Sequence, residues 1–204
     1  MKKGYTHIGL VLDASGSMSS IREDVLGSLR SFAEDQLAAQ EADETNRLDV
    51  WQFSDEVRHI LNNALLKDYS RIDYRCDGCT ALYDAVCVGI DDLGRQFAAM
   101  PEEERPEDVV FVIVTDGYEN ASKEFCLGDV RKRIETQSKV YSWRFVFLAS
   151  NIDVDAVGES MGLASGEDCV ELSNKDFAGG MGRAMSRVQA SVRAERRERR
   201  ARGE

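Results

Sequence analysis

The sequence predicts a doubly wound α/β domain, in which helices cover both faces of a mainly parallel sheet. Three segments are almost continuously apolar and rich in β-branched or aromatic residues, as expected of strands that are buried on both faces. They span Ile8–Leu12, Val109–Val114 and Phe145–Leu148. Segments with helical periodicity lie between them. Strands that alternate with helices through right-handed crossovers form a sheet of this class.

Two further segments complete the predicted strands. Leu48–Phe53 alternates more strongly between apolar and polar residues, and Val57–Leu61 follows it after a polar break. This pair predicts a hairpin that places an antiparallel strand at one edge of the sheet. Cys169–Leu172 predicts a short final strand.

The helices of the N-terminal half show clear signals. Ser20–Glu23 matches a capping box, in which a hydroxyl and a carboxylate satisfy free backbone donors at a helix start. One buried face then follows at Val25, Leu29, Phe32 and Leu37. The strongest helical pattern is Ala81–Met100, with Pro101 just beyond its end. Its apolar residues recur every three or four positions, at Leu82, Val86, Ile90, Leu93, Phe97 and Met100.

The helices of the C-terminal half are predicted from similar spacing. Val130 and Ile134 mark one helix, and a short helix ending near Met161 is closed by Gly162. The last helix is predicted to open at Ser173, with an apolar stripe at Phe177, Met181, Met185, Val188 and Val192. We therefore predict one domain over residues 1–192 and a flexible, Arg-rich tail over 193–204. The tail is interpreted as solvated, with an acidic partner as the alternative.

Composition restricts the possible partners and location. The 204 residues carry a formal net charge of -11, which disfavours nucleic acid and anionic lipid as partners. No apolar stretch approaches the roughly 18 residues that a membrane span requires. Five cysteines, an odd number, fit a reducing compartment better than a disulfide framework. We therefore expect a cytoplasmic protein that binds neither membranes nor nucleic acid.

Ligands bind sheets of this class outside the carboxyl ends of the strands. Five residues with side-chain oxygens are expected at this edge, because they directly follow a strand or precede a helix. Asp13, Ser15 and Ser17 follow the first strand, Asp116 follows the second buried strand, and Thr80 precedes the strongest helix. Two carboxylates and three hydroxyls form a hard donor set that suits Mg²⁺, Mn²⁺ or Ca²⁺ and disfavours zinc. Taken singly, each motif is weak, because Asp-Gly and Ser-Gly-Ser are common in turns.

The combined pattern resembles the metal-ion-dependent adhesion site of von Willebrand factor A domains. The phrases LDASGSMSSIRED, TALYDAV and VIVTDGYENAS are similar to those of stand-alone cytoplasmic A-domain proteins of bacteria and phages. The resemblance runs from about His7 to Val192. It implies a mainly parallel six-stranded sheet with one antiparallel edge strand.

The resemblance also implies roles for the five residues. Ser15, Ser17 and Thr80 would coordinate the metal directly, while Asp13 and Asp116 would bind it directly or through water. A Glu or Asp of a protein partner would complete the metal's coordination. The implied function is metal-dependent protein binding without catalysis. The alternative is a degenerate site on the same fold, which no longer binds metal.

The rival function is a Mg²⁺-dependent phosphoryl-transfer hydrolase of the haloacid dehalogenase type. Such enzymes also place a strand-end Asp and Mg²⁺ at the switch point of a doubly wound sheet. They require a second Asp two residues after the nucleophile, and Ser15 occupies that position here. No Walker-type Gly-Lys-Ser/Thr loop follows the first strand either. We therefore expect a binding module and not an enzyme.

A Cys-x-x-Cys at Cys76 and Cys79 departs from the resemblance, because it lies in the loop before Thr80 and is foreign to the metal motif. It is interpreted as two incidental loop thiols, with a redox switch or half a zinc site as alternatives. Zinc is disfavoured because only His7 and His59 are available as further ligands. Both histidines are expected to have structural roles.

Overall fold

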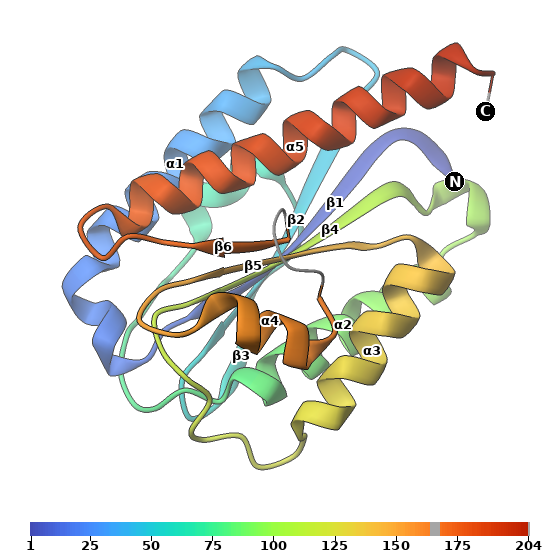
Figure 1. Cartoon of the computed structure of the whole chain (residues 1–204). Helices are drawn as coiled ribbons and strands as arrows, with labels where there is room; N and C mark the ends of the chain where they lie inside the picture. The colour runs from blue at the N-terminus through green and yellow to red at the C-terminus, as the bar shows by residue number, and fades with distance from the viewer. Residues whose placement is uncertain (164–167, 204) are drawn as a thin grey trace.

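The chain forms a single six-stranded sheet between two layers of helices (Figure 1). The computed structural model describes residues 1–163 and 168–203. Its strands are β1 (Lys2–Asp13), β2 (Thr45–Phe53), β3 (Val57–Leu65), β4 (Pro106–Thr115), β5 (Arg144–Ala149) and β6 (Cys169–Glu171). Its α-helices are α1 (Arg22–Ala38), α2 (Leu82–Ala98), α3 (Leu127–Tyr141), α4 (Val154–Met161) and α5 (Phe177–Ala201). Three short 3₁₀ helices are η1 (Gly16–Ile21), η2 (Leu66–Arg71) and η3 (Glu102–Glu104).

The sheet topology confirms the predicted fold class. The strand order is β3-β2-β1-β4-β5-β6. Strand β1 pairs in parallel with β2 and β4, and β5 pairs in parallel with β4 and β6. Strand β3 runs antiparallel to β2 at the edge, as the hairpin pattern predicts. The sequence order reverses between β1 and β4, which makes this pair the topological switch point of the sheet.

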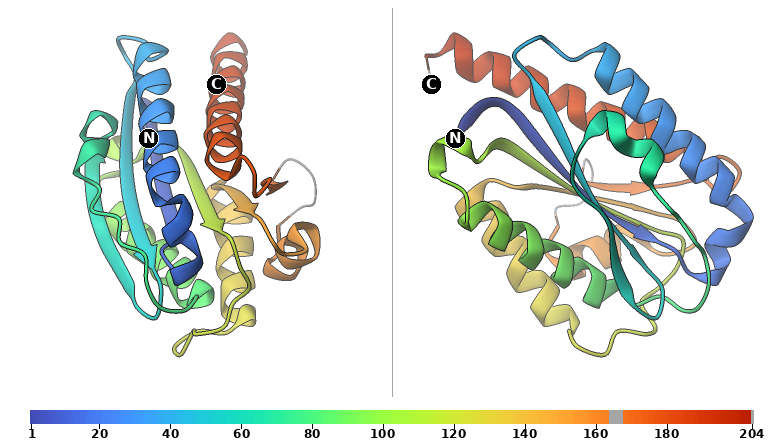
Figure 2. Two further views of the ribbon diagram at one scale, coloured as in Figure 1. Left: turned by 90° about the vertical axis from the view of Figure 1, so that its left-hand side faces the viewer. Right: turned by 180° about the vertical axis from the view of Figure 1, so that it is seen from behind.

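Helices cover both faces of the sheet, so the molecule has two apolar cores. Ile8, Leu10 and Leu12 of β1 face the core shared with α1 and α5. Val11 faces the opposite core, which is shared with α2, α3 and α4. Successive strand residues point to opposite faces, and this explains why a continuously apolar strand is required. Figure 2 shows the two helical layers from the side and from behind.

Helix α2 packs closely against the sheet because a glycine lies at the contact. A Cβ atom at Gly89 would lie 2.9 Å from the ring of Phe111 and 3.2 Å from Val11. Both distances are shorter than ordinary van der Waals contacts, so a larger residue would push α2 away. The close packing fixes α2, and with it Thr80 at its N-terminal side, against the central strands.

The start of α1 differs from the prediction, and the capping box at Ser20–Glu23 is wrong. The helix begins at Arg22, and the preceding Ile21 makes no capping hydrogen bond. Ser20 lies within η1, where its hydroxyl donates to the carbonyl of Ser17 at 3.4 Å. The residue predicted to cap α1, Ser20, therefore lies instead in the 3₁₀ turn that follows β1.

The last helix and one apolar position also differ from the prediction. Helix α5 begins at Phe177 and not at Ser173. Ser173 instead starts a turn, because its carbonyl accepts from the backbone N–H of Asp176 at 3.0 Å. Leu37, predicted to be buried, is exposed at the end of α1.

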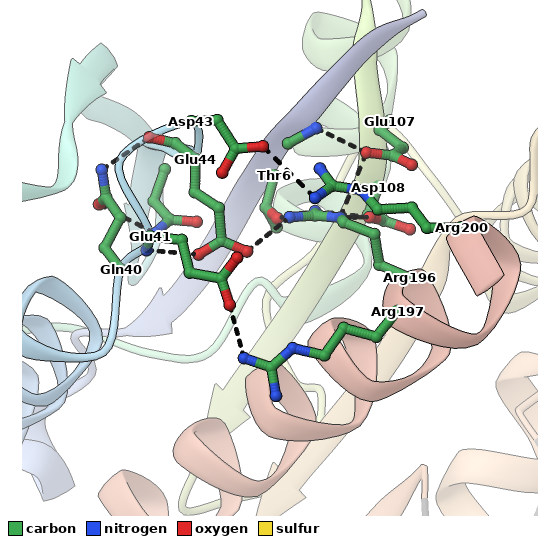
Figure 3. Close-up of polar contacts among 12 residues, drawn as sticks. Thr6, Gln40, Glu41, Asp43, Glu44, Glu107, Asp108, Arg196, Arg197 and Arg200 are labelled. Atoms are coloured by element: carbon green, nitrogen blue, oxygen red, sulfur yellow. Dashed lines mark hydrogen bonds and ion pairs between the residues drawn. The ribbon is translucent and has the colours of Figure 1, made fainter.

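The predicted boundary at Val192 is also wrong, because α5 continues to Ala201 and packs against the sheet. Its anchor is Arg196, which is only 2% exposed. The Arg196 guanidinium lies 3.1 Å from Glu44, 3.2 Å from Glu107 and 2.6 Å from Asp108 (Figure 3). It also donates to the hydroxyl of Thr6 at 2.6 Å. A buried charge of this kind requires such partners.

Neighbouring arginines of α5 extend this arrangement towards the surface. Arg197 pairs with Glu41 at 2.6 Å, Arg199 with Asp108 at 2.7 Å and Arg200 with Asp43 at 3.3 Å. The segment interpreted as a solvated tail is therefore tied to the loop before β2 and to the start of β4. Glu204 lies outside the described residues.

A second buried polar network joins three strands. Asp49 of β2 accepts hydrogen bonds from His7 of β1 and His59 of β3, both at 2.7 Å, and from the backbone N–H of Asn63 at 2.9 Å. Burial by itself would raise the pKa of Asp49, but the histidine hydrogen bonds hold that pKa below its usual value. Burial lowers the pKa of His7 and favours its neutral form. Both histidines thus take part in strand packing, as the sequence predicts.

Replacing Arg196 with Ala is predicted to lower the free energy of unfolding by about 3–5 kcal/mol, because it leaves buried carboxylates without their cation. Arg197→Ala is the matched control on the same helix. Its side chain is 69% exposed, so we expect a loss below about 1 kcal/mol. Chemical denaturation measures both values. Equal stabilities of the two variants would contradict the anchoring role of Arg196.

Candidate metal centre

The structure places all five predicted site residues at the carboxyl edge of the sheet. Asp13 is the last residue of β1, and Asp116 directly follows β4. Ser15 and Ser17 lie in the turn that leads into α1, and Thr80 lies two residues before α2. Because β1 and β4 are parallel neighbours, the two carboxylates follow adjacent strand ends.

Asp13 is fully buried and held by two short hydrogen bonds. Its Oδ1 accepts from the backbone N–H of Ser15 at 2.7 Å, and its Oδ2 accepts from the Thr115 hydroxyl at 2.5 Å. Burial raises the pKa of Asp13, these hydrogen bonds oppose the rise, and the nearby charge of Asp116 adds to it. In the described part of the chain, no Lys or Arg forms an ion pair with Asp13. A cation would therefore offset a charge that the protein itself leaves unbalanced.

A chain of hydroxyls links the two carboxylate loops. The Ser17 hydroxyl donates to Oδ1 of Asp116 at 2.7 Å, and it lies 3.0 Å from the Ser15 hydroxyl. Ser15 is in turn bonded to Asp13 through its backbone. Four of the five predicted residues thus form one connected group of oxygen atoms.

The loop that carries Thr80 is hydrogen-bonded to the turn after β1. The backbone N–H of Gly16 donates to the carbonyl of Gly78 at 3.1 Å, and that of Asp77 donates to the carbonyl of Ala14 at 2.8 Å. Thr80 itself is 4% exposed. No hydrogen bond joins the Thr80 hydroxyl to another described residue, so the structure does not tie it to the four connected side chains.

Gly78 is required by the shape of this loop. Its φ of +72° is a conformation that residues with a side chain rarely adopt, and a Cβ atom there would lie 2.0 Å from the Asp55 carboxylate. Glycine avoids both the strain and the collision. The loop can therefore approach the turn after β1 closely.

The donor set fits a hard divalent cation. It contains two carboxylates and three hydroxyls, which are oxygen ligands suited to Mg²⁺ and to a metal that keeps some of its water. No group of three or more His, Cys, Asp or Glu side chains suited to a metal occurs among residues 1–163 and 168–203.

Comparisons with known proteins identify the fold. No family model and no curated protein matches the chain. Proximal thread matrix protein 1 from the mussel byssus superposes with a TM-score of 0.65 at 16% identity, covering 91% of this chain and 46% of that one. A von Willebrand factor type A protein from Catenulispora acidiphila gives a TM-score of 0.57 at 13% identity, covering 90% of this chain and 42% of that one. The chain has the von Willebrand factor type A fold.

A second structure of the mussel protein also matches the fold. It has a zinc-occupied MIDAS motif, with a TM-score of 0.58 at 17% identity, and the match covers 89% of this chain and 46% of that one. The present chain spans about half the length of that protein. The six-stranded sheet with one antiparallel edge strand, which the resemblance to A domains implies, is confirmed.

The two thiols near the site are both free. Burial raises the pKa of Cys76, and a hydrogen bond to Asp55 raises the pKa of Cys79. Raised pKa values favour the protonated thiols, which are poor nucleophiles and poor metal ligands. The interpretation of Cys76 and Cys79 as incidental loop thiols stays a prediction.

Three further residues, which no sequence motif marks, hold Asp13 and Thr80 in place. Thr115 hydrogen-bonds Asp13, and the buried Tyr74 donates its hydroxyl to the Asp13 carbonyl. Asn120 bonds the backbone of Thr80. Thr115 and Asn120 lie in the phrase VTDGYENAS, which carries the resemblance to A domains, but no local spacing assigns them these partners.

Replacing Thr115 with Val is predicted to lower the free energy of unfolding by about 1.5–3 kcal/mol, because a hydrogen bond to a buried carboxylate is lost. The matched control is Thr136→Val, whose hydroxyl bonds a carbonyl within α3 at an exposed position. We expect the control to change stability by at most about 0.5 kcal/mol. Denaturation in EDTA compares the variants, and equal losses would argue against the support of Asp13 by Thr115.

Proposed function

We propose that this chain is a metal-dependent protein-binding module. In this proposal Asp13, Ser15, Ser17, Thr80 and Asp116 hold a divalent cation, and the cation captures a Glu or Asp carboxylate of a protein partner. The observation that carries the proposal is the connected oxygen group at the switch point, with Asp13 buried and its charge unbalanced.

The electrostatics explain why a metal would be needed. The chain carries a formal net charge of -11, so an acidic partner is repelled by the surface as a whole. A bound dication reverses the sign of the charge locally. A carboxylate can then bind at the metal while other acidic surfaces stay excluded, which gives the contact its specificity.

Mg²⁺ is the proposed metal, because short hydroxyl ligands and retained water suit its small octahedral coordination. Mn²⁺ and Ca²⁺ are the alternatives. The zinc-occupied MIDAS motif of the mussel protein supports a divalent cation and makes zinc a necessary comparison in any titration.

The remaining proposals concern class and location. We propose a non-enzymatic role, because Ser15 occupies the position where a haloacid dehalogenase requires its second Asp. Nucleic acid and membranes are not proposed as partners. No helix in the described part of the chain has the length and apolarity to cross a membrane. Cytoplasmic location is proposed from the five cysteines, all of them free.

Saturating Mg²⁺ or Mn²⁺ is predicted to stabilise the folded state by about 2.7 kcal/mol at a concentration 100 times the dissociation constant. Asp116→Ala should abolish this gain, because it removes one of two charged ligands. Asp155→Ala, an exposed acid on α4, is the control and should keep it. Thermal melts with Mg²⁺, Mn²⁺, Ca²⁺, Zn²⁺ or EDTA supply the measurement. An equal metal response of wild type and Asp116→Ala would show that the site is misassigned.

Partner capture is predicted to require both the metal and a partner carboxylate. A pull-down from the native host with Mg²⁺ or EDTA identifies partners that bind only with metal. Thr80→Ala should weaken capture, because it removes one oxygen ligand and leaves the first turn of α2 in place. Changing the partner's critical Glu to Gln should abolish binding. A specific partner that binds equally well in EDTA and to both Thr80→Ala and Asp116→Ala would rule out capture through the metal.

A further inference from the structure

The N-terminus of α2 lacks a capping residue of its own. The residue before the helix is Ala81, which has no side-chain oxygen. The free N–H groups are satisfied instead by the loop after β4, residues 116–126. Tyr83 donates its backbone N–H to Glu119 at 2.9 Å, and Asp84 donates its backbone N–H to the Ser122 hydroxyl at 3.1 Å. A helix start needs such acceptors, and here they come from a segment about 40 residues away.

The same loop depends on α2 in return. The Asp84 carboxylate accepts the backbone N–H groups of Lys123 at 2.8 Å, Glu124 at 3.1 Å and Phe125 at 2.8 Å. Each segment thus caps the other. This reciprocal arrangement fixes α2 against the 116–126 loop without using any of the five proposed metal ligands.

Asn120 makes a separate connection within this contact. Its Oδ1 accepts the backbone N–H of Thr80 at 2.8 Å, and its own backbone N–H donates to the Thr80 carbonyl at 3.0 Å. Both backbone polar atoms of Thr80 are therefore bonded to one residue. Asn120 lies four positions after Asp116, so it joins the Thr80 backbone to the loop that carries the second carboxylate.

Asn120 is exposed and belongs to neither apolar core. Its removal costs no core packing, and the bonds of Glu119, Ser122 and Asp84 still hold the start of α2. Loss of the Asn120 side chain therefore leaves both apolar cores and these bonds in place. The bond of that side chain to Thr80 constrains the position of Thr80 relative to Asp116.

We propose that Asn120 is a positioning residue of the metal centre and acts through Thr80. This inference rests on the proposed metal site. Groups that orient metal ligands typically contribute 10–100-fold to metal affinity. Asn120 would contribute by holding the Thr80 oxygen within reach of a cation that is also bound to Asp116.

A double-mutant cycle on Mg²⁺ affinity tests this role. Wild type, Asn120→Ala, Thr80→Ala and the double variant are titrated with Mg²⁺ by calorimetry. Asn120→Ala is expected to weaken binding by about 10-fold or more. The double variant is expected to bind Mg²⁺ as Thr80→Ala alone does, because Asn120 has no ligand left to position. Asn120→Asp keeps the acceptor oxygen and should restore most of the affinity.

Controls separate this role from a general effect on folding. Asn62→Ala removes another exposed Asn, on β3 and bonded to His59, and should leave Mg²⁺ affinity unchanged. Melts in EDTA check that Asn120→Ala is folded. If Asn120→Ala is not folded, Asn120→Ser takes its place. Serine keeps a polar side chain at this exposed position, but it is too short to accept the Thr80 N–H.

The outcomes distinguish the inference from the proposed function. Wild-type affinity in Asn120→Ala, or losses that add fully in the double variant, would overturn the role of Asn120 while the metal site stands. Absence of Mg²⁺ binding by wild type, or unchanged binding by Thr80→Ala, would overturn the inference together with the proposed set of ligands.

Discussion

The arrangement of the site depends on the reversal of strand order between β1 and β4. The chain leaving β1 turns to α1 on one face of the sheet, and the chain leaving β4 reaches α3 on the other. The two connections diverge, so the ends of these neighbouring strands remain open to ligands. Asp13 and Asp116 follow them, and the Thr115 hydroxyl links the end of β4 to Asp13. Two carboxylates thus lie near each other, and the charge of Asp116 helps to raise the pKa of Asp13. A cation bound between them would relieve this repulsion.

The fold was predictable from the sequence because burial on both faces leaves a strong local pattern. A segment such as Ile8–Leu12 must be apolar throughout, since Leu10 and Val11 face different cores. Asp13 directly follows this apolar segment, so it lies at the carboxyl end of the strand, where ligands bind sheets of this class. Four of the five predicted site residues are connected by hydrogen bonds, because their positions follow from strand ends and one short turn.

The remaining features could not be predicted, because they depend on partners distant in the sequence. Arg196 looks solvated in a run of charged residues, yet its partners Glu44 and Asp108 lie 152 and 88 positions away. The start of α2 shows no cap locally, and its acceptors come from the loop after β4. A capping motif fails in the same way at Ser20, where the turn after β1 takes precedence over local preference. Local patterns report on propensity and periodicity, whereas these contacts are set by tertiary packing.

The acidic residues at the two ends of the sheet differ in whether the chain supplies them with a positively charged partner. At the amino ends of the parallel strands, Glu44, Glu107 and Asp108 surround Arg196, so the chain supplies its own cation there. At the carboxyl ends, no Lys or Arg in the described part of the chain forms an ion pair with Asp13 or Asp116. Burial of a carboxylate without a counter-ion destabilises the folded state. At the amino ends of the strands, Arg196 of α5 supplies that counter-ion. At the other end the hydroxyls of Ser15 and Ser17 supply neutral oxygens but no positive charge. The fold thus pairs its acidic residues with arginine at one edge of the sheet and leaves carboxylate and hydroxyl oxygens without a positive charge at the other. A cation from solution would stabilise the folded state most at this second edge.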